Sequence, residues 1–222
     1  MSLSISNEVF EKTGHDEIAE RTFFLAVGAA VCYGLGLTAW VANYFASINY
    51  HPSLSALLIL GLALPIIGII MAAMSHDPII SLIGYHLILV PFGVILSPIV
   101  NIYAPNVIAK AFGLTACITG IMTVLAVSHP DWFKNLGAPL FFALSGLIVV
   151  RILQIFIPFL AGLTIIDYAA AGIFSLYIGY DMYRATHVPK TFDNAVDIAV
   201  SLYLDILNLF LVLLRLYGDS DD

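Results

Sequence analysis

Long apolar runs are the feature that most restricts how this chain can fold. A helix that crosses the ~30 Å hydrocarbon core of a bilayer needs about 20 apolar residues. Short segments with turn chemistry, such as the one at Val188-Pro189, separate stretches of that length. The pattern predicts an all-α membrane protein with seven transmembrane helices, at residues 21–47, 53–74, 78–101, 104–127, 135–158, 163–184 and 194–217.

Composition agrees with an integral membrane protein. Of the 222 residues, 61% are hydrophobic and only 10% are charged, whereas soluble domains are about 25% charged. We expect an acidic cytoplasmic tail over residues 1–20, a seven-helix transmembrane domain over 21–217, and an acidic tail over 218–222. No stretch is basic enough to indicate a nucleic-acid partner.

The distribution of basic residues predicts the orientation in the membrane. Cytoplasmic loops carry an excess of lysine and arginine. Seven crossings from a cytoplasmic amino terminus place the carboxyl terminus outside. The expected cytoplasmic side has five basic residues, Lys12, Arg21, Lys134, Arg184 and Lys190, against Lys110 and Arg215 on the other side.

Two aspartates inside the last two expected spans are the strongest functional signal. Asp181 lies near the cytoplasmic end of the sixth span, and Asp205 lies near the middle of the seventh. An ionisable side chain inside a span costs roughly 2.5–3.5 kcal/mol even on the lenient insertion scale. Such residues typically mark a route for ions or protons, so we interpret both as candidate residues of an ion or proton pathway.

The seventh span carries a polar stripe. Its polar residues recur in steps of three and four and therefore share one helical face. Lipid would not tolerate that face, which predicts that the seventh helix is central and that the other six surround it. Besides Asp205, the stripe contains Asp193, Asp197, Ser201 and Asn208, and the last three are candidate pore or network residues.

Spacing leaves open whether the two aspartates meet. A separation of 24 residues fits antiparallel neighbours that turn near Asp193, whereas a turn at Pro189 offsets the pair in depth by about 10 Å. If Asp181 and Asp205 do meet, they would share one proton and titrate as a unit. They would also suit a hard cation such as calcium. A purely structural hydrogen-bonded pair is the alternative.

The roles of other charged and polar residues within the spans each have two possible interpretations. Arg151 in the fifth span and Asp167 at the start of the sixth predict an ion pair, with an arginine lining an ion route as the alternative. His86 in the third span could sense protons near neutral pH or be a core histidine with satisfied hydrogen bonds. The remaining histidines, in the tail or at turns, show no metal-ligand spacing.

Three stretches resemble the Bax inhibitor family, also called the transmembrane Bax inhibitor motif family. They are Phe174–Asp181, Ser201–Arg215 and, more weakly, Ala111–Ala116. The chain also fits the length and the seven-span plan of that family. The resemblance implies six helices around a central seventh, and a pH-sensitive calcium leak with Asp181 and Asp205 as the gating pair and calcium ligands.

The resemblance further implies no enzymatic activity and no cofactor apart from calcium as the permeant or bound ion. Membrane lipids, calcium and protons are the expected partners. Leak-branch relatives have an arginine at the end of the second span that latches onto the sixth-span aspartate, but here that position reads Met74–Asp77. His76 or Arg184 would have to replace it, or the latch is absent. Short loops and an acidic carboxyl terminus suggest a bacterial cell (inner) membrane.

Three other functions compete with a cation leak. A non-catalytic modulator would act on a membrane protease or a stress response through a membrane protein partner. An aspartyl intramembrane protease fits Tyr180-Asp181 and Asp205, but its Gly-x-Gly element is replaced here by Leu202–Leu204, and no Pro-Ala-Leu element follows. A secondary transporter is disfavoured because the chain shows no internal repeat.

Overall fold

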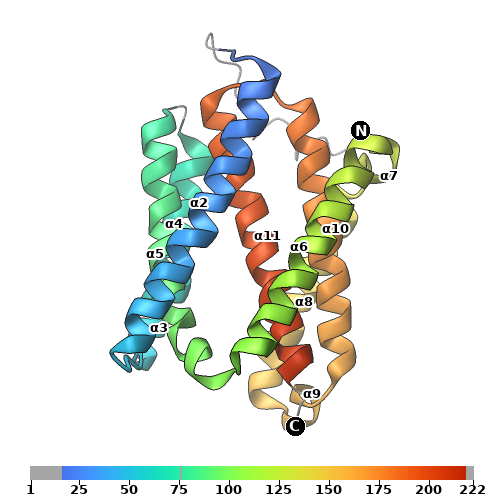
Figure 1. Cartoon of the computed structure of the whole chain (residues 1–222). Coiled ribbons are helices and arrows are strands. Elements are labelled where there is room, and N and C mark those ends of the chain that lie inside the picture. The colour runs from blue at the N-terminus through green and yellow to red at the C-terminus, as the bar shows by residue number, and fades with distance from the viewer. Residues whose placement is uncertain (1–16, 76, 219–222) are drawn as a thin grey trace. The chain divides into compact units, whose positions relative to one another are not determined.

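The computed structural model describes residues 17–75 and 77–218, and in this part of the chain every regular element is a helix. Figure 1 shows the long helices joined by short turns. They are α2 (Glu20–Ser47), α5 (Pro78–Ile102), α6 (Pro105–Ser128), α8 (Gly137–Phe156), α10 (Thr164–His187) and α11 (Phe192–Gly218). Between α2 and α5, the helical segments α3 (Leu54–Leu58), η1 (Ile59–Ala63) and α4 (Leu64–Met74) follow one another directly, and α7 (Pro130–Phe133) and α9 (Pro158–Ala161) are short.

Six helical segments in the described part of the chain are long and apolar enough to cross a membrane. They match the first five expected spans and the seventh. The sixth, α10, has 24 residues, which is long enough to cross. Helix α10 is less hydrophobic than the other six segments because it carries Asp167, Asp181, Arg184 and several tyrosines. Its crossing, and with it the arrangement of six helices around a seventh, remains a prediction.

The chain forms two compact units. The first contains the chain up to Ala104 together with His187–Tyr203, and the second contains Pro105–Thr186 together with the chain from Leu204 onward. Helix α11 therefore contributes its first half to one unit and its second half to the other. Of the six candidate spans it is also the most buried, with 56% of its apolar window inside the protein.

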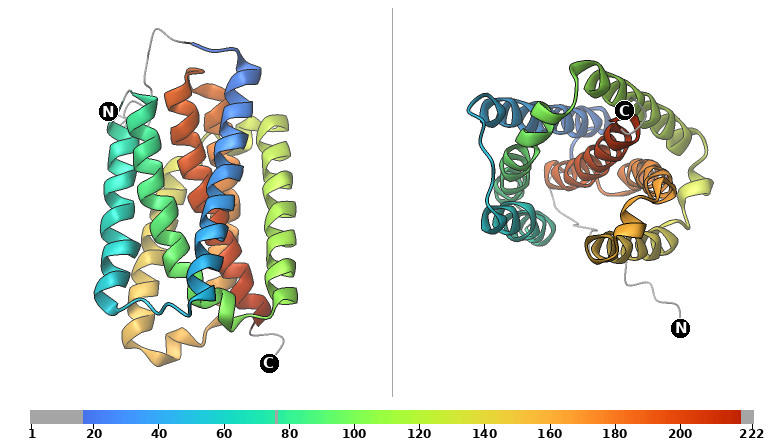
Figure 2. Two further views of the ribbon diagram at one scale, coloured as in Figure 1. Left: turned by 60° about the vertical axis from the view of Figure 1, so that its left-hand side comes forward. Right: turned by 90° about the horizontal axis from the view of Figure 1, so that it is seen from below.

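Glycines allow close helix contact in the first unit. Figure 2 shows α4 and α5 side by side, and Gly68 and Gly84 lie at their contact: a Cβ on Gly84 would stand 2.5 Å from the Gly68 carbonyl oxygen. On the next helix pair, a Cβ on Gly93 would stand 2.6 Å from the Cβ of Val41 in α2. Small residues of this kind let membrane helices pack backbone to backbone.

The first half of α11 is held in that unit by polar contacts. The Tyr203 hydroxyl shares a 2.7 Å hydrogen bond with the Thr38 hydroxyl of α2, and Ser81 of α5 donates a 2.7 Å hydrogen bond to Asp193. The turn before α11 is also fixed, because the Ile18 amide donates to the Lys190 carbonyl at 2.7 Å. These contacts set the axial position of α11.

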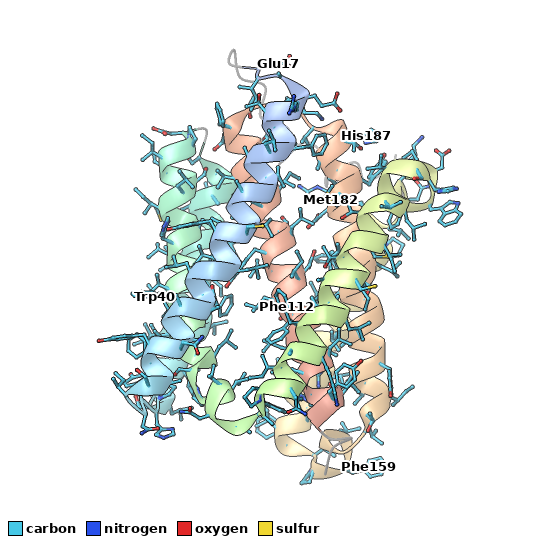
Figure 3. The ribbon with its side chains drawn as sticks, viewed as in Figure 1. Glu17, Trp40, Phe112, Phe159, Met182 and His187 are labelled. Atoms are coloured by element: carbon cyan, nitrogen blue, oxygen red, sulfur yellow. The ribbon has the colours of Figure 1, made fainter. Side chains whose placement is uncertain are left out.

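In the second unit, α10 packs closely against its neighbours through two further glycines. Phe133 of α7 covers Gly179, and a Cβ on Gly137 at the start of α8 would stand 2.5 Å from the Tyr180 hydroxyl. Many large apolar side chains are exposed: Figure 3 labels Trp40, Phe112 and Phe159, which are 67%, 61% and 74% exposed. Exposed apolar side chains of this size are typical of a surface that contacts lipid.

We predict that Gly84→Ala destabilises the protein, because the new Cβ would clash with the backbone of α4. Overpacking of this kind costs about 1–3 kcal/mol. Gly28→Ala is the matched control in α2, because nothing lies within 4 Å of the position that its Cβ would take, and it should be neutral or slightly stabilising. Thermal unfolding in detergent would compare the two. Equal melting temperatures for both variants would contradict the close α4–α5 contact.

We also predict opposite sides of the membrane for the two termini, with the amino terminus cytoplasmic. The prediction follows from the basic residues and from a crossing by α10. Reporter enzymes fused to each end, one active only in the cytoplasm and one only outside, would locate them. Finding both termini on one side would mean that one expected span, with α10 the first candidate, does not cross.

Candidate ion site at two buried aspartates

The structure brings the carboxyl groups of Asp181 and Asp205 together. Asp181 is on α10 and Asp205 is on the second half of α11, so both belong to the second compact unit. They are 4% and 9% exposed, and their side chains lie within hydrogen-bonding reach of each other. The meeting that the sequence spacing left open is therefore present in the structure.

The turn between the two helices lies at residues 188–191, so of the two alternatives that the spacing left open the structure has the turn at Pro189. Asp193 is instead inside the first turn of α11. The chain leaves α10, forms the first half of α11 within the other unit, and rejoins α10 from Leu204 onward. A hairpin with a central turn is thus not what places Asp205 next to Asp181.

Arg184 forms an ion pair with Asp181. It lies one helical turn after Asp181, and its Nη1 donates to Asp181 Oδ1 at 2.9 Å. A guanidinium at this distance favours the ionised carboxylate. A hydrogen bond between two carboxyl groups needs one proton between them. The site therefore combines one guanidinium with two carboxyl groups.

Asp205 has fewer hydrogen bonds to its carboxyl oxygens than Asp181. Its Oδ2 is buried and has no hydrogen-bond partner among the described residues. Tyr177, one turn before Asp181 on α10, is close enough to interact electrostatically with both carboxyl groups. Sequence analysis did not select Tyr177, although its position four residues before Asp181 places it on the same helix face.

The polar stripe of α11 is divided between the two units. Asp197 and Ser201 are half-buried and belong to the first unit, whereas Asn208 belongs to the second with Asp205. Asn208 donates to the Leu204 carbonyl of its own helix at 2.8 Å, so its amide is satisfied locally. The stripe is therefore shared between the two units, and its member Asp205 lies next to Asp181.

The predicted ion pair between Arg151 and Asp167 is present, with 2.6 Å between Nη2 and Oδ1. The structure adds Arg215, whose Nη1 lies 3.3 Å from the same oxygen. Sequence analysis gave Arg215 no role beyond its loop charge. Asp167 and Asp181 are 14 residues apart on α10, or about 21 Å along a helix. The arginine cluster is therefore separate from the aspartate pair.

His86 is a histidine with satisfied hydrogen bonds. Its Nδ1 lies 2.8 Å from the Leu82 carbonyl and its Nε2 lies 2.7 Å from the Tyr33 hydroxyl. Because a carbonyl can only accept, Nδ1 donates to it, and a neutral imidazole then accepts from Tyr33. His86 belongs to the first unit, whereas the aspartate pair belongs to the second. His76, the other proposed substitute for the latch, lies outside the described residues.

Comparisons with known proteins agree on a membrane protein. A family model described as "Inhibitor of apoptosis-promoting Bax1" matches residues 20–222. An uncharacterised membrane protein of Streptococcus pyogenes serotype M3 is 28% identical over 92% of this chain and 96% of its own length. The inner membrane protein YbhL of Escherichia coli K12 is 26% identical, over 90% and 92%. An uncharacterised protein of Helicobacter pylori is 36% identical, but the alignment spans 51% of this chain and about half (48%) of that relative.

We predict that Asp167→Asn destabilises the protein more than loss of either arginine. The substitution leaves two guanidinium groups facing each other, whereas Arg151→Leu leaves Asp167 with Arg215. Breaking a buried pair by removing one partner costs on the order of 3 kcal/mol. Thermal unfolding in detergent would rank the variants, with Asp131→Asn as an exposed control. A larger loss for Arg151→Leu than for Asp167→Asn would contradict the shared role of Asp167.

Proposed function

Because this chain belongs to the Bax inhibitor family of multi-pass membrane proteins, we propose that it is a pH-sensitive leak for calcium, gated by Asp181 and Asp205. The observation that carries the proposal is the pair of buried carboxyl groups within hydrogen-bonding reach. The bacterial relatives support a bacterial inner membrane as its location.

The chemistry of the pair links protons to cations. While Asp205 holds the shared proton, the two carboxyl groups attract each other through a hydrogen bond. Loss of that proton leaves two negative charges in a site with little water, where like charges repel strongly. A divalent cation between them neutralises both. Calcium and the proton therefore compete for the same oxygens, and calcium binding weakens as the pH falls.

Two carboxylates would bind a permeating cation only weakly, and they provide too few ligands to hold a cation permanently. Calcium takes six to eight oxygen ligands in a tight site, as a rough rule. No group of three or more histidine, cysteine, aspartate or glutamate side chains in residues 17–75 and 77–218 could hold a metal ion. An ion that enters between Asp181 and Asp205 would keep part of its water shell and be able to leave again. This supports a leak instead of a storage site.

Arg184 takes the part that the missing second-span arginine plays in the family pattern. Its ion pair with Asp181 occupies one of the two carboxylates that a cation would need. A cation arriving at the pair must therefore compete with Arg184 as well as with the proton. Because Arg184 is on the same helix as Asp181, this latch does not require a second helix to move.

We predict that calcium flux through the purified protein in liposomes depends on pH and that Asp205→Asn largely removes this dependence. One controlling proton changes a response by at most about tenfold per pH unit, and the variant should change by less than about twofold. Asp181→Asn should shift the profile. Arg184→Gln should move its midpoint to higher pH, by about one unit or more, since ionisation then loses a nearby positive charge.

Asp193→Asn is the matched control for this experiment. Asp193 is also a buried aspartate of α11, but it accepts a hydrogen bond from Ser81, and asparagine can accept the same bond. It should keep the wild-type pH profile. Wild-type pH profiles in both Asp181→Asn and Asp205→Asn would show that the pair is structural. No calcium flux by the wild-type protein at any pH would favour a modulator of another membrane protein.

A further inference from the structure

A second charged site lies at the other end of α10 and has an excess of positive charge. Asp167 is 4% exposed and is the shared acceptor of Arg151 and Arg215. Two guanidinium groups and one carboxylate leave a net charge of about +1. Both arginines approach the same oxygen, Oδ1, so neither forms the bidentate pair with Asp167 that a guanidinium prefers.

Arg215 has unused hydrogen-bonding capacity that faces outward. A guanidinium has five N–H donors. Arg151 uses Nη2 on Asp167 and Nη1 on Gln154, whereas the described contacts of Arg215 involve Nη1 alone. The Arg215 side chain is 48% exposed, compared with 26% for Arg151. Arg215 can therefore bind a further anion while Asp167 and Arg151 hold the base of the cluster.

Large apolar side chains surround this end of the second unit. Figure 1 shows α9 and the end of α11 at the same end of that unit, and Figure 3 shows Phe159 projecting from it. The helix termini that meet there, α8, α9 and α10, expose an apolar rim. Its members are Ile155 (76% exposed), Phe156 (74%), Phe159 (74%) and Tyr168 (63%).

We propose that this cluster binds the phosphate of a phospholipid with a net negative headgroup. Arginine suits a phosphate because its planar donors match two oxygens at once. An arginine beside exposed aromatic side chains is typical of the boundary between headgroups and acyl chains. The apolar rim contacts the acyl chains of the same lipid, which a free phosphate ion could not use. The site is independent of the proposed leak and lies at the opposite end of α10 from Arg184.

The rival occupant is the chain's own acidic end. Asp219, Asp221 and Asp222 follow Arg215 closely in the sequence and lie outside the described residues. The polar aspartate and serine side chains of this end would gain no stability from contact with the apolar rim, whereas acyl chains would. The rim therefore favours a lipid as the occupant. A chain that ends at Gly218 separates the two occupants.

The test is lipid retention by the full-length protein, measured by native mass spectrometry in detergent with equal amounts of phosphatidylglycerol and phosphatidylcholine. The wild-type protein should retain phosphatidylglycerol in preference. Arg215→Gln should lower that retention about fivefold, the effect of one basic side chain at an anionic membrane surface. Arg215→Lys keeps the charge but loses the planar donors, and it should give an intermediate loss.

Arg21→Gln is the matched control, because Arg21 is an exposed arginine at the start of α2 in the other unit. It should retain phosphatidylglycerol as the wild type does, and the chain ending at Gly218 should retain at least as much. Equal losses in Arg215→Gln and Arg21→Gln would overturn the proposal, as would no preference between the two lipids. Retention only by the shortened chain would also overturn it, because the acidic end would then be the occupant.

Discussion

Charge buried in an apolar protein must be compensated, and this constraint governs α10 and α11. Helix α10 carries Asp167 and Asp181, and each is matched to arginine. The remaining buried carboxyl group in the described part of the second unit, Asp205, lies within hydrogen-bonding reach of Asp181. The two ends of α10 thus differ: two arginines meet one carboxyl group at Asp167, whereas one arginine meets a pair of carboxyl groups at Asp181.

Close packing fixes α10 next to the aspartate pair. Two residues before Asp181, Gly179 lies under Phe133, and the neighbouring Tyr180 places its hydroxyl over Gly137. These contacts fix the rotation of α10 and so the direction of Asp181. A larger residue at Gly179 would displace the helix and change the distance between the carboxyl groups. The glycines next to the site therefore hold the two carboxyl groups at a fixed distance through helix packing.

Helix α11 connects the aspartate pair to the rest of the protein. Its first half is tied to α2 and α5 through Tyr203 and Asp193, and its second half carries Asp205. A rotation or shift of α11 would break the contact between Asp205 and Asp181 or the contacts of the first half. Helix α11 therefore carries contacts of both units along one continuous helix.

The sequence by itself determined the helices, most of their limits and the candidate functional residues. Apolar runs of membrane length and proline-containing turns depend on local chemistry, and six of the expected spans match helices of the structure. The ion pair of Arg151 with Asp167 was also predictable, because opposite charges near one membrane face have few other partners. Only the tertiary structure decided that Arg215 joins them, that Arg184 binds Asp181, and that Asp205 reaches Asp181 despite an off-centre turn. Those contacts depend on the rotation and axial shift of whole helices, which are set by packing between residues far apart in the chain.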